Sequence, residues 1–497
     1  MTTPKNAAHF PGAAGVNAHT IDHWIRNTAR RTSKRVAIDY LDREVTYEEL
    51  DVRSDGLAGE LLARGLRRGD RVATLTGNTP EHVIVFFACA KAGLILLPLN
   101  WRLAAPELRF QLEDAEPSVF LVEPEYESLA AATAHAFEPL APPYDRATAV
   151  TTTDVDADDP LLLIYTSGTT GRPKGALLTH ANCFWTNLSF DLATGLTGDD
   201  VVLQVLPQFH CGGWNVQPLL AWWKGGRVVL ERTFEPARVL SLVAEKRVTT
   251  LMGVPAVYLF LSHEPAFAEA DLSSLRLAVV GGAPMPEELI RVWQERGVEI
   301  VQGYGLTEAA PNVLCLPPED AMRKMGSAGK PYPYVEVRLG DESELQVRGP
   351  NVFPGYWRNP EATAAVLRDG WLHTGDVAEM DDEGCYRIRG RLKEMFISGG
   401  ENVYPAEVES VLHEHASVAD AAVVGVPDER WGEVGVAFVV AKEPVTDDAL
   451  VEHCRDRLAR YKVPKRIVLV DALPMSAMNK VLKDELRALL AHEEVTA

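Results

Sequence analysis

Several short segments of this chain combine glycines with hydroxyl, ammonium or carboxylate side chains, a composition typical of nucleotide sites. The richest is YTSGTTGRPKG at residues 165–175, where glycines let the backbone approach a ligand closely. The residues that could surround phosphate oxygens are Thr166, Ser167, Gly168, Thr169, Thr170 and Lys174. Because Pro173 stands before the lysine, the spacing differs from the Walker pattern G-x-x-x-x-G-K-[ST]. The segment therefore predicts a triphosphate-binding loop outside the phosphoryl-transfer ATPases.

Two later segments could hold the base and the phosphates of a nucleotide. GGAP at residues 281–284 follows an apolar strand and could lay its backbone against a flat ring such as adenine, although a strand-ending turn is an equal alternative. In QGYGLTEAAP, residues 302–311, Tyr304 between two glycines offers a flat face. Thr307 and Glu308 offer a hydroxyl and a carboxylate, which suit phosphate and Mg²⁺. A glutamate at such a junction is more often solvated, but its neighbours favour a functional role.

Two side chains from distant parts of the sequence could complete the site. Asp376 follows a tight turn in LHTGD, where a carboxylate could accept both hydroxyls of a ribose; the alternative is an ordinary Thr-Gly-Asp turn. Lys480 lies in a short loop before an amphipathic helix, where a solvated lysine is the default expectation. The pair His210-Cys211 does not predict a thiol nucleophile, because sequence neighbours rarely face each other and the sequence identifies no third orienting group.

Alternating helices and strands would position these segments. Helical patterns at Tyr47–Arg64 and Glu81–Ala92 enclose a strand at Arg71–Leu75, and this alternation predicts an α/β fold with parallel sheets. A hairpin-rich section follows at about residues 332–390, and a later helix is expected at Asp447–Tyr461. The predicted architecture is a large domain of parallel-sheet α/β subdomains plus a β-rich subdomain, followed by a small, mobile α+β domain.

Chain length and local composition suggest where the domains begin and end. With 497 residues the chain is too long for a single core. We expect a flexible lead-in at 1–18, an N-terminal domain at 19–390 with a linker at 141–159, and a C-terminal domain at 391–497. The border falls in the charged stretch Arg389–Glu394, where a rigid-body rotation could occur.

Overall composition narrows the class of protein. The net charge of −21 argues against a nucleic-acid partner, because phosphate backbones require a basic face. Six cysteines without a C-x-x-C pair predict reduced thiols and a cytoplasmic protein. The N-terminus lacks the apolar core of a signal peptide, and the most apolar region, His82–Trp101, is interrupted by lysine, glycine and proline. We therefore expect no integral membrane segment.

In their order along the chain, these segments resemble those of the adenylate-forming superfamily, which comprises acyl- and aryl-CoA ligases, the adenylation domains of peptide synthetases and beetle luciferases. The similar segments are YTSGTTGRPKG, LPQFHCGG, GGAP, QGYGLTE, LHTGD, GRLKEMFISGGENVYPAEVE and the late NK. They extend over nearly the whole chain from about Ile21, and ISGGENVYPAEVE with VGVPDERWGE is most similar to bacterial fatty-acyl and 4-coumarate-type CoA ligases. The resemblance implies that a carboxylate attacks the α-phosphorus of ATP, pyrophosphate leaves, and CoA then takes the acyl group with release of AMP.

The resemblance also implies a set of nucleotide-binding residues in the 19–390 domain. The residues implied to bind ATP are Thr166–Thr170 and Lys174 at the β- and γ-phosphates, Thr307 at the α-phosphate, Gly282, Ala283, Pro284, Gly303 and Tyr304 around the adenine, and Asp376 with Arg391 at the ribose. Glu308, together with Thr169, would hold Mg²⁺.

A mobile lysine is implied for the 391–497 domain. Lys480 would bridge carboxylate and α-phosphate oxygens, then withdraw as this domain rotates about Lys393. The residues implied to line the pantetheine channel after rotation are Ser398, Gly399 and Gly400. His210 would gate the thiol at the mouth of the acyl pocket. Asn479 stands where glycine is usual and Glu394 where aspartate is common, but Lys480 itself is present.

The acyl pocket is expected to form from two of these segments. Its implied residues are His210, Trp214, Asn215, Gly303, Gly305 and Ala309. Gly305 stands where short-chain members of the superfamily have tryptophan, so a medium-chain, long-chain or cyclic acid would fit. Trp214 and Asn215 would narrow the pocket and add one polar contact, which favours an aromatic or polycyclic acid.

Several alternatives to a CoA ligase are open. The enzyme could pass its acyl group to a carrier protein or another acceptor. An amino-acid-activating domain would need a pocket carboxylate, and no Asp or Glu occurs from Val201 to Leu230. A luciferase-like oxygenase has no separate signal, and a non-catalytic nucleotide-binding protein is disfavoured by the joint presence of Lys480, Glu308 and Asp376. The expected partners are a small carboxylic acid, ATP and CoA; the oligomeric state stays open, with a homodimer as one option.

Overall fold

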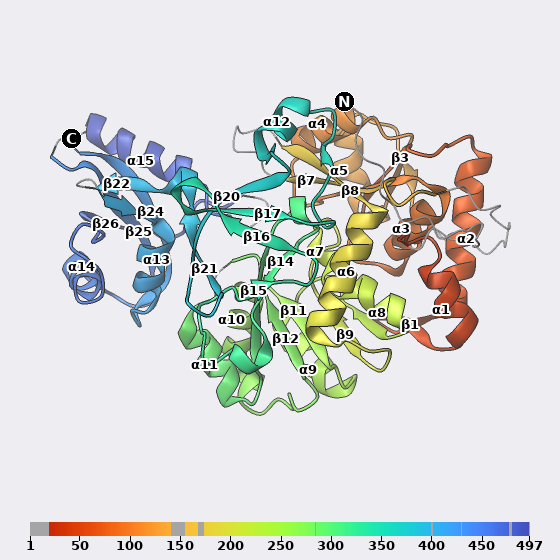
Figure 1. Cartoon of the computed structure of the whole chain (residues 1–497), viewed down its shortest axis with the longest axis horizontal. Coiled ribbons are helices and arrows are strands. Elements are labelled where there is room, and N and C mark those ends of the chain that lie inside the picture. Colours follow the sequence, from red (N-terminus) through yellow and green to blue (C-terminus); the bar gives the residue numbers. More distant parts are fainter. Residues whose placement is uncertain are drawn as a thin grey trace.

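The computed structural model describes residues 19–140, 155–166, 173–283, 285–398, 401–428, 430–476 and 480–496, with side chains up to residue 490. Two large sheets and their helices form the main body, and the C-terminal part, drawn in blue, is a separate lobe beside it (Figure 1). The lead-in predicted at 1–18 and most of the linker predicted at 141–159 lie outside the described residues.

The largest sheet has nine strands in the order β15-β14-β13-β12-β11-β9-β10-β1-β2. Its strands are β1 (Val36–Tyr40), β2 (Arg43–Thr46), β9 (Val201–Gln204), β10 (Arg227–Leu230), β11 (Thr250–Gly253), β12 (Leu277–Val280), β13 (Ile300–Gly305), β14 (Asn312–Cys315) and β15 (Lys330–Pro331). Strands from β1 through β13 in this order pair in parallel, and only the outer pairings are antiparallel. The carboxyl ends of β12 and β13 therefore lie side by side, where ligands of α/β sheets bind.

The second sheet has seven strands in the order β18-β8-β7-β4-β3-β5-β6. Its strands are β3 (Arg71–Leu75), β4 (Ile95–Leu99), β5 (Val119–Val122), β6 (Glu138–Pro139), β7 (Pro160–Thr166), β8 (Lys174–Thr179) and β18 (Gly355–Tyr356). Antiparallel pairing of β7 with β8 places Thr166 opposite Lys174. The predicted triphosphate loop is thus the connection between two paired strands.

A third, antiparallel sheet carries the ribose-site candidates. Its strands are β16 (Glu336–Leu339), β17 (Glu344–Arg348), β19 (Leu367–Arg368), β20 (Trp371–Met380) and β21 (Tyr386–Arg391). In the pairing of β20 with β21, Asp376 lies opposite Arg391. The hairpin register therefore brings together two residues that are fifteen positions apart in sequence.

The C-terminal lobe has its own sheet and its own cores. Its elements are β22 (Phe396–Ser398), β23 (Glu401–Val403), α13 (Pro405–His413), β24 (Val418–Asp428), β25 (Gly432–Ala441), α14 (Asp447–Arg455), β26 (Arg466–Leu469) and α15 (Lys483–Thr496). Two clusters of buried apolar residues lie within this lobe, one on each side of the β24–β25 pair. Strand β21 leads into the lobe (Figure 1).

Helices cover the two large sheets. They are α1 (Trp24–Thr32), α2 (Tyr47–Ala63), α3 (Pro80–Ala92), α4 (Ala105–Ala115), α5 (Glu127–Ala132), α6 (His180–Thr194), α7 (Gly212–Asn215), α8 (Pro218–Lys224), α9 (Pro236–Glu245), α10 (Pro255–His263), α11 (Glu287–Glu295) and α12 (Pro360–Val366). Helix α3 shows how the sequence sets their ends. The Thr79 hydroxyl accepts from the His82 N–H at its start, Pro80 occupies the first turn, and Gly93 ends it at φ 67°.

The expected fold class, parallel α/β sheets with a β-rich part and a small C-terminal α+β domain, is confirmed. The strand expected at Arg71–Leu75 is β3. The helix predicted at Asp447–Tyr461 is shorter: α14 ends at Arg455, because the Cys454 carbonyl accepts from the N–H groups of both Arg457 and Leu458 and the chain tightens into a turn.

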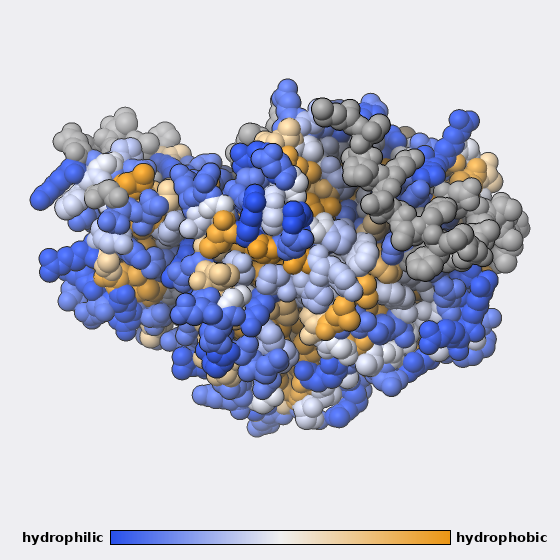
Figure 2. Space-filling model, in the orientation of Figure 1, coloured by the Kyte–Doolittle hydropathy of each residue, from blue (hydrophilic) through white to orange (hydrophobic). Residues whose placement is uncertain are grey.

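The described residues include no helix with the length and apolar character needed to cross a bilayer. The face drawn in Figure 2 is mostly hydrophilic, and its hydrophobic residues occur in small separate groups.

Candidate active site

A buried carboxylate, Asp376, connects the nine-stranded sheet to the third, antiparallel sheet. The Tyr304 hydroxyl, on β13, donates to Asp376 Oδ2 at 2.5 Å, and Arg391 Nε lies 2.7 Å from Asp376 Oδ1. Burial raises the pKa of Asp376, while the Arg391 charge and the Tyr304 hydroxyl oppose the shift. Since a carboxylate has about four acceptor positions, Asp376 keeps acceptor capacity for a ligand's hydroxyl groups.

The turn that carries Asp376 is fixed by its neighbours in the sheet. Glu344 Oε1, on β17, accepts from the Gly375 N–H at 3.0 Å, and the Thr374 hydroxyl donates to the Leu345 carbonyl at 2.7 Å. His373 Nδ1 lies 2.6 Å from Glu344 Oε2. The LHTGD segment is therefore fixed by side-chain and backbone contacts with β17, which a turn of this sequence alone would not require. Sequence reasoning missed Glu344.

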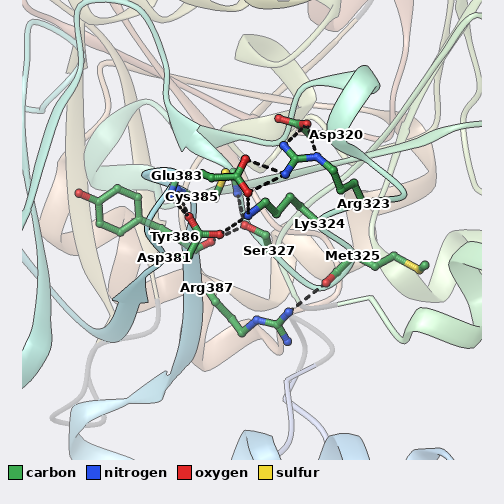
Figure 3. A network of polar contacts seen from close by, with 11 residues as sticks. Asp320, Arg323, Lys324, Met325, Ser327, Asp381, Glu383, Cys385, Tyr386 and Arg387 are labelled. Carbon is green, nitrogen blue, oxygen red and sulfur yellow. Dashed lines mark hydrogen bonds and ion pairs between the residues drawn. The ribbon is translucent and has the colours of Figure 1, made fainter.

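The far end of the same hairpin is tied down by a network of charges (Figure 3). Arg323 lies 2.6 Å from both Asp320 and Glu383, and Lys324 lies 2.7 Å from both Asp381 and Glu383. Two further hydrogen bonds join the same segments, Ser327–Tyr386 and Arg387–Met325. This network joins the β20–β21 turn to the segment after β14, so both strands that carry the ribose-site candidates are anchored.

Glu308 lies near β8, the strand that directly follows the predicted triphosphate loop. The Tyr356 hydroxyl, on β18, donates to Glu308 Oε1 at 2.8 Å, and Lys174 Nζ lies 5.3 Å from the centre of the Tyr356 ring. Tyr356 thus stands between the carboxylate and the lysine, a role that sequence reasoning did not identify. Its only sequence signal is an aromatic residue in GYW next to a glycine.

The donor set at Glu308 fits a magnesium ion that is shared with phosphates. Mg²⁺ in nucleotide sites usually takes one or two carboxylates together with phosphate oxygens and waters. Glu308 supplies one carboxylate, with one oxygen bound to a hydroxyl. Within the described ranges no group of three or more His, Cys, Asp or Glu forms a closed metal site. The second predicted ligand, Thr169, lies outside the described residues.

Lys480 belongs to the C-terminal lobe but lies at the border with the site. The residue as a whole is exposed, while partial removal of its ammonium group from water lowers the pKa of Lys480, as does the charge of Arg391. Glu308 and Asp376 act in the opposite direction. The two carboxylates of the site therefore both interact electrostatically with Lys480.

Short contacts fix the loop that carries Lys480. The Lys480 N–H donates to Ser476 Oγ at 3.1 Å, and the Ser476 N–H donates to the Lys480 carbonyl at 2.8 Å. Lys483 Nζ lies 3.1 Å from Glu394 Oε2 and 2.8 Å from Glu409 Oε1. Glu394 directly follows the predicted hinge Lys393, so this ion pair connects the hinge to the lysine loop. Sequence reasoning missed Lys483.

His210 lies beside the same charges. Burial, with the positive charges of Arg102 and Lys480, lowers the pKa of His210 to about 4. The imidazole is therefore neutral at physiological pH. Burial raises the pKa of the adjacent Cys211 thiol far above its ordinary value, and it also raises the pKa of the other five cysteines. All six thiols are buried and unpaired, which supports the view that Cys211 is not a nucleophile.

The residues proposed for the acyl pocket lie in two different settings. The Trp214 ring is fully buried, stacks on Phe86 with centroids 4.7 Å apart, and donates from Nε1 to the Gln208 carbonyl at 2.6 Å. Ala309 is equally buried in the core. Both side chains are enclosed by the protein. Asn215, the last residue of α7, is also enclosed, but it belongs to a polar group because its Oδ1 accepts a hydrogen bond from Asn187 on α6.

Gly305 has a local structural reason to be glycine. A Cβ atom built there would lie 1.6 Å from the Pro311 carbonyl oxygen. The Leu306 N–H also donates to this carbonyl, at 3.2 Å. The glycine therefore permits a close backbone approach just before Thr307 and Glu308, so the width of the pocket is not needed to explain it.

The remaining predicted residues lie either at strand ends or outside the described residues. Gly282 and Ala283 are exposed just after β12, Gly303 is on β13, and Ser398 is buried at the end of β22. Thr166 and Thr307 lie at the end of β7 and just after β13. The predicted residues outside the described ranges are Ser167, Gly168, Thr169, Thr170, Pro284, Gly399 and Gly400.

Comparison with known proteins agrees with this geometry. Residues 25–357 match the family "AMP-binding enzyme", and residues 407–480 match "AMP-binding enzyme C-terminal domain". A feruloyl-CoA synthase of Amycolatopsis is 45% identical over 480 residues, covering 93% of this chain and 98% of the relative. An indoleacetate–CoA ligase of Aromatoleum aromaticum is 42% identical, covering 95% and 98% of the two chains.

A solved structure shares the same overall fold. The O-succinylbenzoate coenzyme A synthetase of Bacillus subtilis, in complex with ATP and magnesium ion, superposes with a TM-score of 0.87 at 34% identity. The match covers 94% of this chain and 99% of that one. The resemblance to the adenylate-forming superfamily is thereby confirmed, and these relatives are acid–CoA ligases, as predicted. The chain belongs to the family of AMP-binding enzymes.

Proposed function

We propose that this chain is an AMP-forming acid–thiol ligase, which activates a carboxylic acid with ATP and passes the acyl group to CoA. One observation carries the proposal: the ammonium group of Lys480, from the small lobe, lies within electrostatic range of Glu308, Asp376 and His210. A lysine at the meeting point of a metal carboxylate, a ribose carboxylate and an acyl-side histidine is suited to stabilise charge on an acyl phosphate.

In the first half-reaction, a carboxylate oxygen of the acid attacks the α-phosphorus of ATP, and the bond to pyrophosphate breaks. Lys480 stabilises the negative charge that develops on the α-phosphate oxygens. Asp376 accepts hydrogen bonds from the ribose, and Lys174 faces the triphosphate. Mg²⁺ held at Glu308 would neutralise charge on the departing pyrophosphate. Alignment of the two reactants supplies much of the remaining rate enhancement.

In the second half-reaction, the CoA thiol attacks the acyl carbonyl and AMP leaves. Lys480 has to withdraw before the thiol arrives, which requires the small lobe to rotate. The proposed hinge, Lys393, lies in the single turn Leu392–Glu394 between β21 and β22, and so between the two lobes. His210, neutral at physiological pH, can contact the acyl group or the thiol without adding charge.

The proposed acid is aromatic, with long-chain and polycyclic acids as the second class. Ferulate and indoleacetate, the acids in the names of two relatives, are aromatic and carry an O–H or N–H group on the ring system. The enclosed polar group around Asn215 is compatible with such an acid. We place the enzyme in the cytoplasm because its six thiols are buried and unpaired.

The test is the stoichiometry of the reaction with a panel of acids. Purified protein is incubated with ATP, Mg²⁺, CoA and a single acid, and pyrophosphate, AMP and acyl-CoA are measured together. We expect one pyrophosphate, one AMP and one acyl-CoA per turnover with at least one aromatic or long-chain acid. Release of AMP and pyrophosphate without any acyl-CoA would favour a carrier protein as acceptor. Absence of acid-dependent pyrophosphate release with every acid would refute acid activation itself.

A further inference from the structure

The inner face of helix α6 is polar at positions where a core-facing helix is normally apolar. Cys183, Thr186, Asn187 and Phe190 have the spacing i, i+3, i+4, i+7 and form one buried stripe. Thr186 and Asn187 are 0% exposed. Since burial of polar atoms costs free energy unless they are hydrogen-bonded, two polar residues in this stripe need partners.

The amide of Asn187 is oriented by its own hydrogen bonds. Its Nδ2 donates to the Cys183 carbonyl at 2.7 Å and to Asn215 Oδ1 at 3.2 Å. Both N–H groups of the amide are then used, and Oδ1 is left as an acceptor. Among the described residues Asn187 Oδ1 has no hydrogen-bond partner, and neither has the Thr186 hydroxyl oxygen. The group offers two adjacent acceptor oxygens without a donor to match.

A short series of contacts leads from this group to the reaction centre. Asn215 Nδ2 lies 3.6 Å from the sulfur atoms of both Cys183 and Cys211, and Cys211 directly follows His210. The negative charge of Glu308 also reaches the Cys211 thiol. The Asn187 amide is therefore linked, through Asn215, to Cys211, the residue next to His210.

The same group touches the strand that follows the predicted magnesium carboxylate. Asn312 Nδ2, at the start of β14, lies 3.5 Å from the Thr186 carbonyl oxygen. Helix α6 contacts both α7 and β14. The group around Thr186 and Asn187 thus contacts both the segment that follows His210 and the start of β14.

We infer that Thr186 and Asn187 form an acceptor subsite that selects an aromatic acid with a hydrogen-bond donor, such as a phenolic hydroxyl, at the end opposite its carboxylate. This inference rests on the proposed ligase function. A donor on the ring would satisfy Asn187 Oδ1 or the Thr186 hydroxyl, whereas an acid without one would leave the oxygens unpaired and be discriminated against.

The experiment compares three acids with the same cinnamate skeleton and one unrelated acid. The acids are 4-hydroxycinnamate, which has a donor, 4-methoxycinnamate and cinnamate, which have none, and octanoate. We expect kcat/KM for pyrophosphate release with 4-hydroxycinnamate to exceed the values for the other two cinnamates by about 10-fold to 100-fold. Equal or lower activity with 4-hydroxycinnamate would overturn the inference.

Two variants assign the selectivity to the subsite. Thr186→Val removes only the hydroxyl, and Asn187→Leu replaces the amide by an apolar group of similar size. In at least one of them the ratio of kcat/KM between 4-hydroxycinnamate and cinnamate should fall about 10-fold. A ratio unchanged in both variants would overturn the assignment. Because Thr186→Val changes so little volume, it keeps the test valid if Asn187→Leu fails to fold.

A matched control separates selectivity from stability. Ser189, also buried on α6, donates its hydroxyl to the Pro333 carbonyl at 2.7 Å, away from the acceptor pair. Ser189→Ala should lower the unfolding midpoint without changing the ratio between the acids. Activity with octanoate alone would overturn the subsite and leave the ligase proposal standing. Inactivity with all four acids, and with a wider panel, would overturn both.

Discussion

The two lobes hold their parts of the site in different ways. In the large lobe Asp376 contacts both Tyr304 and Arg391, and its turn is fixed by Glu344 from a neighbouring strand. In the small lobe the Lys480 backbone forms two hydrogen bonds with Ser476, and the charges of Glu308 and Asp376 act on its ammonium group. The difference matches the chemistry proposed, because AMP stays bound through both half-reactions whereas Lys480 acts in one.

The largest effect should come from the lysine itself. Lys480→Ala should lower the rate of pyrophosphate release about 10²-fold to 10³-fold, because charge on the α-phosphate is no longer stabilised. Thioester formation from supplied acyl-adenylate and CoA should fall much less. The matched control is Lys442→Ala, which removes an exposed lysine of the same lobe. Equal losses in the two half-reactions would contradict the assigned role.

A substitution at Asp376 tests the ribose contact proposed for the large lobe. Asp376→Asn should lower kcat/KM for ATP about 10-fold to 100-fold, since it removes the charge that faces Arg391 and weakens acceptance from the ribose. Both half-reactions should be affected. Glu379→Gln breaks another carboxylate–arginine pair of the same hairpin, to Arg389 at 2.5 Å, and should change the rate less than about twofold. A loss confined to thioester formation would argue against a ribose contact.

The pH dependence tests whether the Lys480 charge is needed. Because the pKa of Lys480 is lowered, its ammonium group deprotonates at a lower pH than that of an ordinary lysine. Pyrophosphate release should therefore decline as pH rises through this lowered pKa, by about tenfold per pH unit beyond it. Lys480→Arg keeps the charge at high pH, so its residual activity should lack this decline. The same decline in both proteins would point to a different titrating group.

The smallest effect is expected at the ion pair between hinge and lysine loop. Lys483→Met leaves Glu394 and Glu409 without their shared partner and should slow adenylate formation about twofold to fivefold. Arg487→Met removes the neighbouring exposed pair with Asp484 and serves as the control. We expect no rate change there. If Lys483→Met lowers only the unfolding midpoint, the ion pair supports the fold and does not position the loop.

The sequence predicted the parts of the site whose residue types follow from chemistry. Asp376 and Glu308 are candidates because a ribose and a metal ion each require a particular charged group, whereas the role expected of Lys480 comes from the resemblance to the adenylate-forming superfamily. The α/β class followed from alternating periodicities, and β3 was placed residue for residue. Each of these signals lies within one short segment.

The remaining features of the site depend on contacts between residues that are far apart in the sequence, and no local sequence pattern predicts such contacts. Tyr356 reaches Glu308 from a strand 48 positions away, and Lys483 reaches back to Glu394 across most of the small lobe. The prediction for Gly305 concerned pocket width, yet the Pro311 carbonyl oxygen occupies the space that a Cβ atom at this position would need. Trp214 was expected to narrow the pocket, but it packs in the core. Such contacts arise only when distant strands have paired.

The buried cysteines have a consequence for an enzyme that makes activated acyl groups. Any ionised thiol near a mixed anhydride would compete with the incoming substrate and become esterified. Cys211 directly follows His210 and is therefore the cysteine of concern. Burial raises the pKa of its thiol and keeps the thiol protonated. The fold thereby protects the enzyme from acylating itself, and it reserves the intermediate for a thiol that arrives from outside.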